Sequence, residues 1–190
     1  MRRKKMKKDD VKVENIVASV NLADKLDLDK INREAPENVE YEPEQFPGLV
    51  FRISEPKTAT LLFRSGKANC TGAKSVEDVH TAVKKLISKL GTMGIKVNAN
   101  PKITIQNIVA TYDLNKELNL NEVASHLGYE NVEYEPEQFP GLVYRLDSPR
   151  LVVLLFGSGK IVCTGAKDVD SIKKGIDIII ERLKKAGILD

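Results

Sequence analysis

The chain contains one fourteen-residue segment twice, and this duplication constrains its fold more than any other feature. The segment Glu37–Val50 returns unchanged as Glu130–Val143, at an offset of 93 residues. A second segment, Leu61–Lys74, returns as Leu154–Lys167 with eleven of fourteen residues kept. Internal repeats of this kind indicate a structural unit that is built twice. We therefore expect two similar halves, and we expect any functional site to occur in both.

Most of the chain's positive charge lies in its first ten residues. Residues 1–10 hold six basic and two acidic side chains, so the rest of the chain holds 24 basic and 25 acidic residues. Charge runs of this kind are usually solvated, and we expect a basic, disordered arm here. No apolar run approaches the ~18 residues that a membrane helix needs, and no signal peptide opens the chain. Together with 42% hydrophobic residues, this is typical of a globular protein.

The hydrophobic pattern of the first half predicts strands followed by one long helix. The segment Ser75-Val-Glu-Asp78 resembles a capping box that starts this helix, and Gly91 is expected to end it. A short helix is expected at Leu28–Glu34, and the turn Glu42–Gly48 is expected to project from the sheet. Alternation predicts strands at Lys12–Asn21, Val39–Tyr41, Leu49–Ile53, Thr58–Phe63 and Lys67–Thr71. The apolar stripe of the long helix consists of Val76, Val79, Val83, Leu86, Ile87 and Leu90.

The second half repeats this plan after a linker at Thr92–Pro101. It is expected to have a strand at Ile103–Leu114, a short helix at Leu120–Leu127 and then the same turn, strands and long helix. The stripe of the final helix consists of Val169, Ile172, Ile176, Ile179, Ile180 and Leu183. We therefore expect an α+β fold in which each half has an antiparallel sheet with its long helix packed on one face. The expected limits are an arm at 1–10 and repeats at 11–97 and 98–190.

One long helix can cover only one side of each sheet, which leaves a second side to be explained. Val152, Leu154 and Phe156 share one side of their strand. Val153 and Leu155 lie on the other, so both sides are apolar. Neighbouring strands add asparagines and threonines to one of these sides. Such a mixture is unsuited to a dry core, where unpaired amides are costly, and large exposed apolar patches usually mark interaction sites.

A DNA minor groove fits this mixture of side chains. At A·T pairs the minor groove presents only hydrogen-bond acceptors, adenine N3 and thymine O2, whereas guanine adds an amino group. Asparagine amides and threonine hydroxyls can donate to those acceptors while valines pack on sugars and base edges. Phenylalanines can wedge between base steps, at roughly a few kcal/mol per unstacked step that a bent duplex offsets by touching more protein. Two near-identical halves also suit the near-dyad symmetry of a duplex.

Two duplicated motifs connect the chain to a known family. They are Glu-Pro-Glu-Gln-Phe-Pro-Gly-Leu-Val and Phe-x-Ser-Gly-Lys-x-x-Cys-Thr-Gly-Ala-Lys. With these motifs the chain resembles the TATA-box-binding protein family, most closely its archaeal members, over about residues 11–186. This family is itself a standard example of wedging in the minor groove. The resemblance implies a saddle: two pseudo-symmetric halves that form one curved antiparallel sheet with the two long helices on its convex face.

The resemblance also implies roles for particular residues. The DNA-intercalating phenylalanines fall on Phe46, Phe63, Phe139 and Phe156. The residues expected to contact base edges are Asn15, Asn107, Thr71, Thr164, Val17, Val109, Val162, Asn69, Leu61 and Leu154. Phosphate contacts are expected from Arg52, Lys67, Arg145, Lys160, Ser65 and Ser158. The family usually has a groove valine where this chain has Asn69, so the two halves are not fully equivalent.

The function implied by the resemblance is that of a general transcription initiation factor. Such a factor binds and kinks TATA-box DNA and recruits transcription factor B and, indirectly, RNA polymerase. The resemblance implies that the turn carrying Glu135, Glu137 and Gln138 binds transcription factor B. Because the first-half turn is identical, partner choice between the two ends must depend on residues outside both turns. An archaeal source implies the cytoplasm and a eukaryotic source the nucleus, and a weak homodimer off DNA is compatible with the resemblance.

Two other classes of function compete with this interpretation. An accessory domain of the same fold occurs beside some nucleases and glycosylases, but no catalytic domain is left once both repeats are assigned. An enzyme or small-molecule binder would need a nucleophile–base pair, paired carboxylates, a metal-ligand cluster or a P-loop, and the sequence lacks them. We therefore expect no enzyme activity, metal or cofactor. Cys70 and Cys163 occupy equivalent apolar strands, which favours two buried free thiols over a disulfide.

Overall fold

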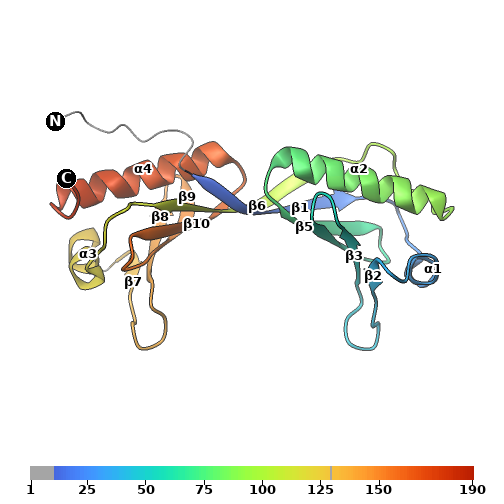
Figure 1. The fold of residues 1–190 in the computed structure, drawn as a ribbon, viewed down its shortest axis with the longest axis horizontal. Coiled ribbons are helices and arrows are strands. Elements are labelled where there is room, and N and C mark those ends of the chain that lie inside the picture. Colours follow the sequence, from blue (N-terminus) through green and yellow to red (C-terminus); the bar gives the residue numbers. More distant parts are fainter. Residues whose placement is uncertain (1–10, 129) are drawn as a thin grey trace. The chain divides into compact units, whose positions relative to one another are not determined.

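The computed structural model describes residues 11–128 and 130–190, so the predicted basic arm at 1–10 lies outside the described residues. The chain divides into two compact units. The first comprises residues 15–106, and the second comprises the described residues from 107 to 190 together with residues 11–14. Figure 1 shows the helices and strands of each unit.

The first unit follows the predicted order of elements. Its helices are α1 (Leu28–Glu34) and α2 (Val76–Thr92). Its strands pair antiparallel in the order β2-β3-β4-β5-β1. Their bounds are β1 (Lys12–Asn21), β2 (Val39–Glu40), β3 (Leu49–Ile53), β4 (Thr58–Leu62) and β5 (Lys67–Ala73). Strand β4 ends one residue earlier than predicted and β5 two residues later, within the usual uncertainty of element ends.

The second unit repeats this arrangement. Its helices are α3 (Leu120–Leu127) and α4 (Val169–Lys185). Its strands pair antiparallel in the order β6-β10-β9-β8-β7. Their bounds are β6 (Ile103–Asp113), β7 (Val132–Glu133), β8 (Leu142–Asp147), β9 (Arg150–Leu155) and β10 (Lys160–Ala166). The predicted α+β class, with antiparallel strands and one long helix per half, is confirmed.

Each long helix covers one side of the strands in its own unit (Figure 1). In β1, Ile16 and Ala18 are fully buried, whereas Asn15 and Val17 are partly exposed. Helix α2 contacts β3 and β5, and α4 contacts β10. The buried residues of the two helix stripes include Val79, Val83, Leu86 and Leu90 in α2 and Ile172, Ile176, Ile179 and Leu183 in α4.

The helix stripes are shorter and narrower than the sequence pattern predicts. Val76 is 43% exposed and Val169 is partly exposed, because each occupies the first position of its helix. Ile87 and Ile180 are also partly exposed. Each directly follows a fully buried residue of the stripe, and successive helical residues point about 100° apart. These four side chains therefore lie at the margin of the core.

The prediction that Gly91 ends α2 is wrong. The helix continues to Thr92, and an added Cβ at Gly91 would meet nothing within 4 Å. The left-handed residue that terminates many helices is Gly94, with φ +68°. The N–H of Ile95 then donates to the Leu90 carbonyl oxygen at 3.0 Å. Gly91 is thus an ordinary residue of the last turn, and the terminating glycine lies three residues later.

The two long helices begin with different capping residues. Ser75 Oγ accepts a hydrogen bond from the Asp78 N–H at 3.0 Å. Asp168 accepts from both the N–H and the hydroxyl of Ser171, at 2.7 and 2.8 Å. These hydrogen bonds hold the pKa of Asp168 below its usual value. Because the folded-state pKa is lowered, the stabilisation is present above the unfolded-state pKa of about 4 and is lost as the pH falls through the folded-state pKa.

We expect Asp168→Ala to lower the free energy of unfolding by about 1 kcal/mol at neutral pH. Asp168→Ser, which copies the cap of α2, should retain most of that stability. The difference between parent and Asp168→Ala should shrink below about pH 4, whereas the difference between the serine and alanine variants should not change with pH. Urea unfolding across this pH range measures both differences. A parent–alanine difference that stays constant into strong acid would contradict the assignment.

Both cysteines are buried and free, as predicted. Burial raises the pKa of Cys70 and raises that of Cys163 to about 12. The thiolate is the reactive form of cysteine, so neither thiol is reactive at neutral pH. Within the described part of the chain, the helices are too short or too polar to cross a membrane.

Candidate nucleic-acid interface

The side of the strands away from each long helix carries a row of exposed cross-strand neighbours. In the first unit this row consists of Val50, Leu61, Asn69 and Ser19. In the second unit it consists of Val143, Leu154, Val162 and Thr111. All eight residues are partly or fully exposed. We call this side the open face of each unit; apolar and hydrogen-bonding side chains lie next to each other on it.

A pair of phenylalanines lies beside each open face. The ring centroids of Phe46 and Phe63 are 6.2 Å apart with an interplanar angle of 66°, and those of Phe139 and Phe156 are 5.9 Å apart at 69°. Both pairs have the edge-to-face geometry that aromatic rings prefer. Phe46 is 45% exposed and Phe139 is 39% exposed. Among the described residues, the only other large hydrophobic side chain so exposed is Val76.

Two glycines make room for these rings, and the sequence analysis missed this role. An added Cβ at Gly48 would lie 2.6 Å from the Phe46 ring, and one at Gly141 would lie 2.7 Å from the Phe139 ring and 2.9 Å from the Phe156 ring. A Cβ at either position would therefore force the phenylalanine rings to shift. The sequence pattern predicts Gly48 only as a residue of the projecting turn. The sequence does contain a signal for this role, because Gly48 and Gly141 each directly follow Phe-Pro.

On each open face, an asparagine on β1 or β6, the outermost strand of its unit in the pairing order, is held by a network of hydrogen bonds. Asn15 Oδ1 accepts from the Gly72 N–H at 2.7 Å, and Asn15 Nδ2 donates to Thr71 Oγ1 at 3.1 Å. A backbone N–H can only donate, so the amide oxygen must face Gly72, which fixes the orientation of the amide. The second hydrogen of Nδ2 has no acceptor among the described residues. We call this network the amide clamp; in the second unit it comprises Asn107, Thr164 and Gly165, at 3.0 and 2.7 Å.

The glycine in each clamp adopts a backbone conformation that other residues rarely adopt. Gly72 has φ +96° and Gly165 has φ +99°. The strand register shifts at these places, between Ile16 and Ala18 on β1 and between Cys163 and Ala166 on β10. Irregularities of this kind often carry a glycine with positive φ and redirect a backbone group. Here each redirected N–H meets the asparagine side chain.

The four predicted phosphate-binding cations fall into two groups. Arg52 donates to Glu40 at 2.9 Å, and Arg145 donates to Glu133 at 3.1 Å. The guanidinium of Arg52 also lowers the pKa of Glu40, through its hydrogen bond and its charge. All four of these side chains are more than half exposed, where such pairs contribute little and are easily exchanged. Lys67 and Lys160 are exposed and form no ion pair with the described residues.

Comparison with known proteins gives one consistent result. The family described as "Transcription factor TFIID (or TATA-binding protein, TBP)" matches residues 10–93 and 102–186. The chain belongs to this family. It is 58% identical to the TATA-box-binding protein of Thermoplasma acidophilum over 179 residues, which cover 94% of this chain and 97% of that protein. The corresponding protein of Archaeoglobus fulgidus is 55% identical with the same coverage of both chains.

A solved structure of the family has the same fold. "Methanococcus jannaschii TBP" matches with a TM-score of 0.82 and 54% sequence identity, covering 93% of this chain and 99% of that one. The chain therefore has the fold of this family. The two stretches matched by the family correspond to the two repeats that the duplicated segment indicated.

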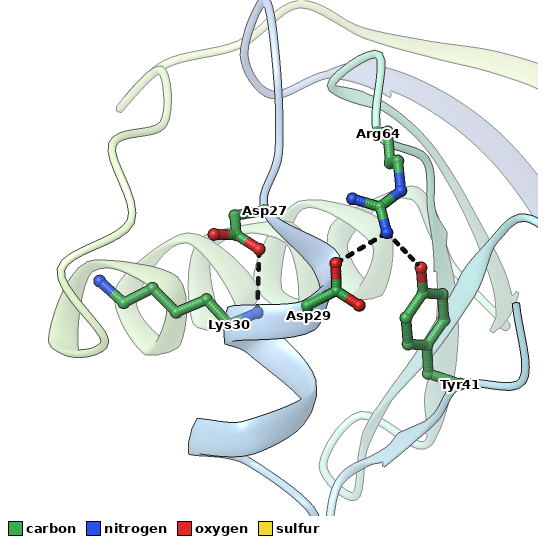
Figure 2. Close-up of polar contacts among 5 residues, drawn as sticks. All are labelled: Asp27, Asp29, Lys30, Tyr41 and Arg64. Atoms are coloured by element: carbon green, nitrogen blue, oxygen red, sulfur yellow. Dashed lines mark hydrogen bonds and ion pairs between the residues drawn. The ribbon is translucent and has the colours of Figure 1, made fainter.

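The two identical turns of this TATA-box-binding family member are supported differently. In the first half, Arg64 Nη2 donates to Asp29 on α1 at 2.8 Å and to the Tyr41 hydroxyl at 2.9 Å. Figure 2 shows this guanidinium between the two acceptors, with the Asp27 cap of α1 beside it. The second half has Gly157 in place of Arg64, so Tyr134 lacks this tether. Arg64 thus ties the base of only one turn to a helix.

Proposed function

We propose that this chain is a transcription initiation factor whose two open faces bind the minor groove of a TATA element. The observation that carries the proposal is the amide clamp, which occurs once in each half. A clamped amide can offer a donor but not an acceptor to a ligand. The minor groove of A·T pairs offers acceptors but no donor, and guanine would add a donor. The clamp therefore favours A·T pairs over G·C pairs where Asn15 and Asn107 face the groove. The proposed limits of the two halves remain 11–97 and 98–190.

The exposed phenylalanine pairs supply the proposed kinks. Phe46 and Phe139 are large apolar side chains at the protein surface, and a wedge between base steps would remove them from water. Unstacking costs a few kcal/mol per step, roughly, and the bent duplex touches more of the protein in return, a mode of binding for which this family is an example. Gly48 and Gly141, which lie beneath the rings, support this role because they let two rings pack edge-to-face in each half.

We assign the phosphate contacts chiefly to Lys67 and Lys160, which have no carboxylate partner among the described residues. Lys160→Ala should weaken binding to all duplexes about equally and should flatten the slope of log K against log salt by roughly one unit. Lys174→Ala, on the exposed side of α4, is the matched control and should leave the slope unchanged. Binding titrations at several salt concentrations measure this slope. A change confined to TATA preference would contradict a phosphate contact.

We further propose that the second-half turn recruits transcription factor B and, through it, RNA polymerase. The identical first-half turn provides an unusually close control. Glu137→Ala should weaken the complex of this chain, a TATA duplex and transcription factor B about tenfold, as truncation of an interfacial charge commonly does. Glu44→Ala, the same change in the same local sequence, should alter it less than about twofold. A gel supershift measures both; equal losses would exclude a preference for the second turn.

A gel shift with A·T-rich and G·C-rich duplexes tests the proposed function. We expect the A·T-rich TATA duplex to bind at least about a thousandfold more tightly at physiological salt, which is typical of specific DNA recognition. Equal affinity for both duplexes would reduce the proposal to non-specific binding. No binding to either would remove it.

A further inference from the structure

The two open faces differ at one position in the middle of their rows. Asn69 on β5 is the cross-strand neighbour of Ser19 and Leu61. The corresponding residue on β10 is Val162, whose neighbours are Thr111 and Leu154. The same place in the repeat therefore carries an amide in the first half and an apolar isopropyl group in the second.

The amide of Asn69 is not held in one orientation. The side chain is exposed and makes no hydrogen bond to any of the described residues. It differs in this from Asn15, whose carbonyl oxygen is bound to the Gly72 N–H at 2.7 Å. The clamped amide presents only its NH₂ group, whereas Asn69 can present either the NH₂ group or the carbonyl oxygen. Asn69 is therefore an amide of this open face that can act as an acceptor as well as a donor.

The surroundings of Asn69 add a donor beside this acceptor. Asn69 lines a hollow of about 550 Å³ together with Ser19, Phe63 and Lys67. Ser19 Oγ accepts a hydrogen bond from Gln106 Nε2 at 2.7 Å, which leaves the hydroxyl hydrogen of Ser19 available. A G·C pair presents in the minor groove the guanine N2 amino donor between two acceptors, guanine N3 and cytosine O2. An acceptor at Asn69 and a donor at Ser19 complement that pattern.

We propose that the first half contains a subsite that accepts a G·C pair, in which Asn69 Oδ1 accepts a hydrogen bond from the guanine N2 amino group. The proposal depends on the proposed function, because it assumes that the open face binds a minor groove. At the equivalent place in the second half, Val162 would leave the amino group without an acceptor, which is costly for a group removed from water. The protein should then bind a TATA element that has one G·C pair at the position facing Asn69 or Val162 in the orientation that places its first half on that pair. Asn69 thereby orients the otherwise near-symmetric protein on its site.

The experiment uses a self-complementary A·T duplex in which one A·T pair of one half-site is replaced, position by position, by G·C or by inosine·C. Inosine lacks only the N2 amino group of guanine, so the ratio of the two Kd values isolates the effect of that group. Either half of the protein can bind the altered half-site, so orientation need not be measured. We expect one position at which the guanine-to-inosine Kd ratio is below about three for the parent and above about ten for Asn69→Val.

The reciprocal variant tests the same idea in the second half. With guanine in both half-sites at that position, the parent should show a ratio above about ten, and Val162→Asn should lower it below about three. Each change places at an exposed strand position the residue that the other half already has, and unchanged thermal unfolding would verify that both variants fold.

A guanine-to-inosine Kd ratio above about ten for the parent at every position, unchanged in Asn69→Val, would overturn the inference. Binding of the parent to the unaltered A·T duplex would still support the proposed function. Loss of parent binding to the unaltered duplex would overturn both.

Discussion

Phe156→Ala should straighten the bound duplex and weaken its binding by roughly tenfold or more. Phe156 packs edge-to-face with Phe139, so its loss would remove one of the proposed wedges and the support of its exposed partner. Without the wedge, the unstacked base step loses its apolar contact and the bend loses part of the protein surface that stabilises it. Energy transfer between dyes at the two ends of a TATA duplex measures the change, and the end-to-end distance should increase.

Val76→Ala is the control for this prediction. Val76 is 43% exposed, which is close to the exposure of Phe46 and Phe139, but it lies on α2, away from the open face. Its loss should change neither the dye distance nor the affinity. If Phe156→Ala leaves the bend intact, Phe156 is not a wedge, whatever its effect on affinity.

Replacing both clamped asparagines, as Asn15→Asp with Asn107→Asp, should abolish specific binding, with a loss of at least about a hundredfold. The new carboxylate can still accept the hydrogen bonds from the glycine N–H and the threonine hydroxyl, so the fold should be retained. It has no donor left for adenine N3 or thymine O2, and it would bring a negative charge against those acceptors. Gel shifts on the A·T duplex measure the loss.

The matched control is the double variant Asn32→Asp with Asn121→Asp, which makes the same isosteric change once in α1 and once in α3. It adds the same charge to the chain outside the open face and should alter affinity only slightly, by roughly the amount that general repulsion from DNA produces. Equal losses from the control and the clamp variant would show that net charge, and not the amide donor, determines binding.

The elements of this fold were largely predictable because their signals are local. Strand β1 and the short helices have the predicted bounds, since alternation defines the strand and Asp27 and Asn119 cap the two helices. The end of α2 was not predictable from Gly91, because glycine is tolerated in a last helical turn where nothing depends on it. The duplication supplied the strongest non-local information, since it made every element of one half a prediction for the other.

The contacts within the site were less predictable because they join residues that are distant along the chain. Alternation places Asn15 and Thr71 on one side of their strands, but their hydrogen bond spans 56 residues and depends on the irregular register at Gly72. The ion pair of Arg52 with Glu40 was also not predicted from the sequence. It needs β2, a strand of two residues, to lie beside β3. Both cases required the register of paired strands, which composition and periodicity do not specify.

The central claim is that the open faces read the minor groove, and inosine tests it most directly. A duplex in which every A·T pair of the TATA element is replaced by inosine·C keeps the minor-groove acceptors and changes the groups in the major groove. We predict that this duplex binds within about tenfold of the A·T duplex and that the corresponding G·C duplex binds at least about a thousandfold more weakly. Inosine·C binding as weak as that of G·C would contradict recognition through the minor groove.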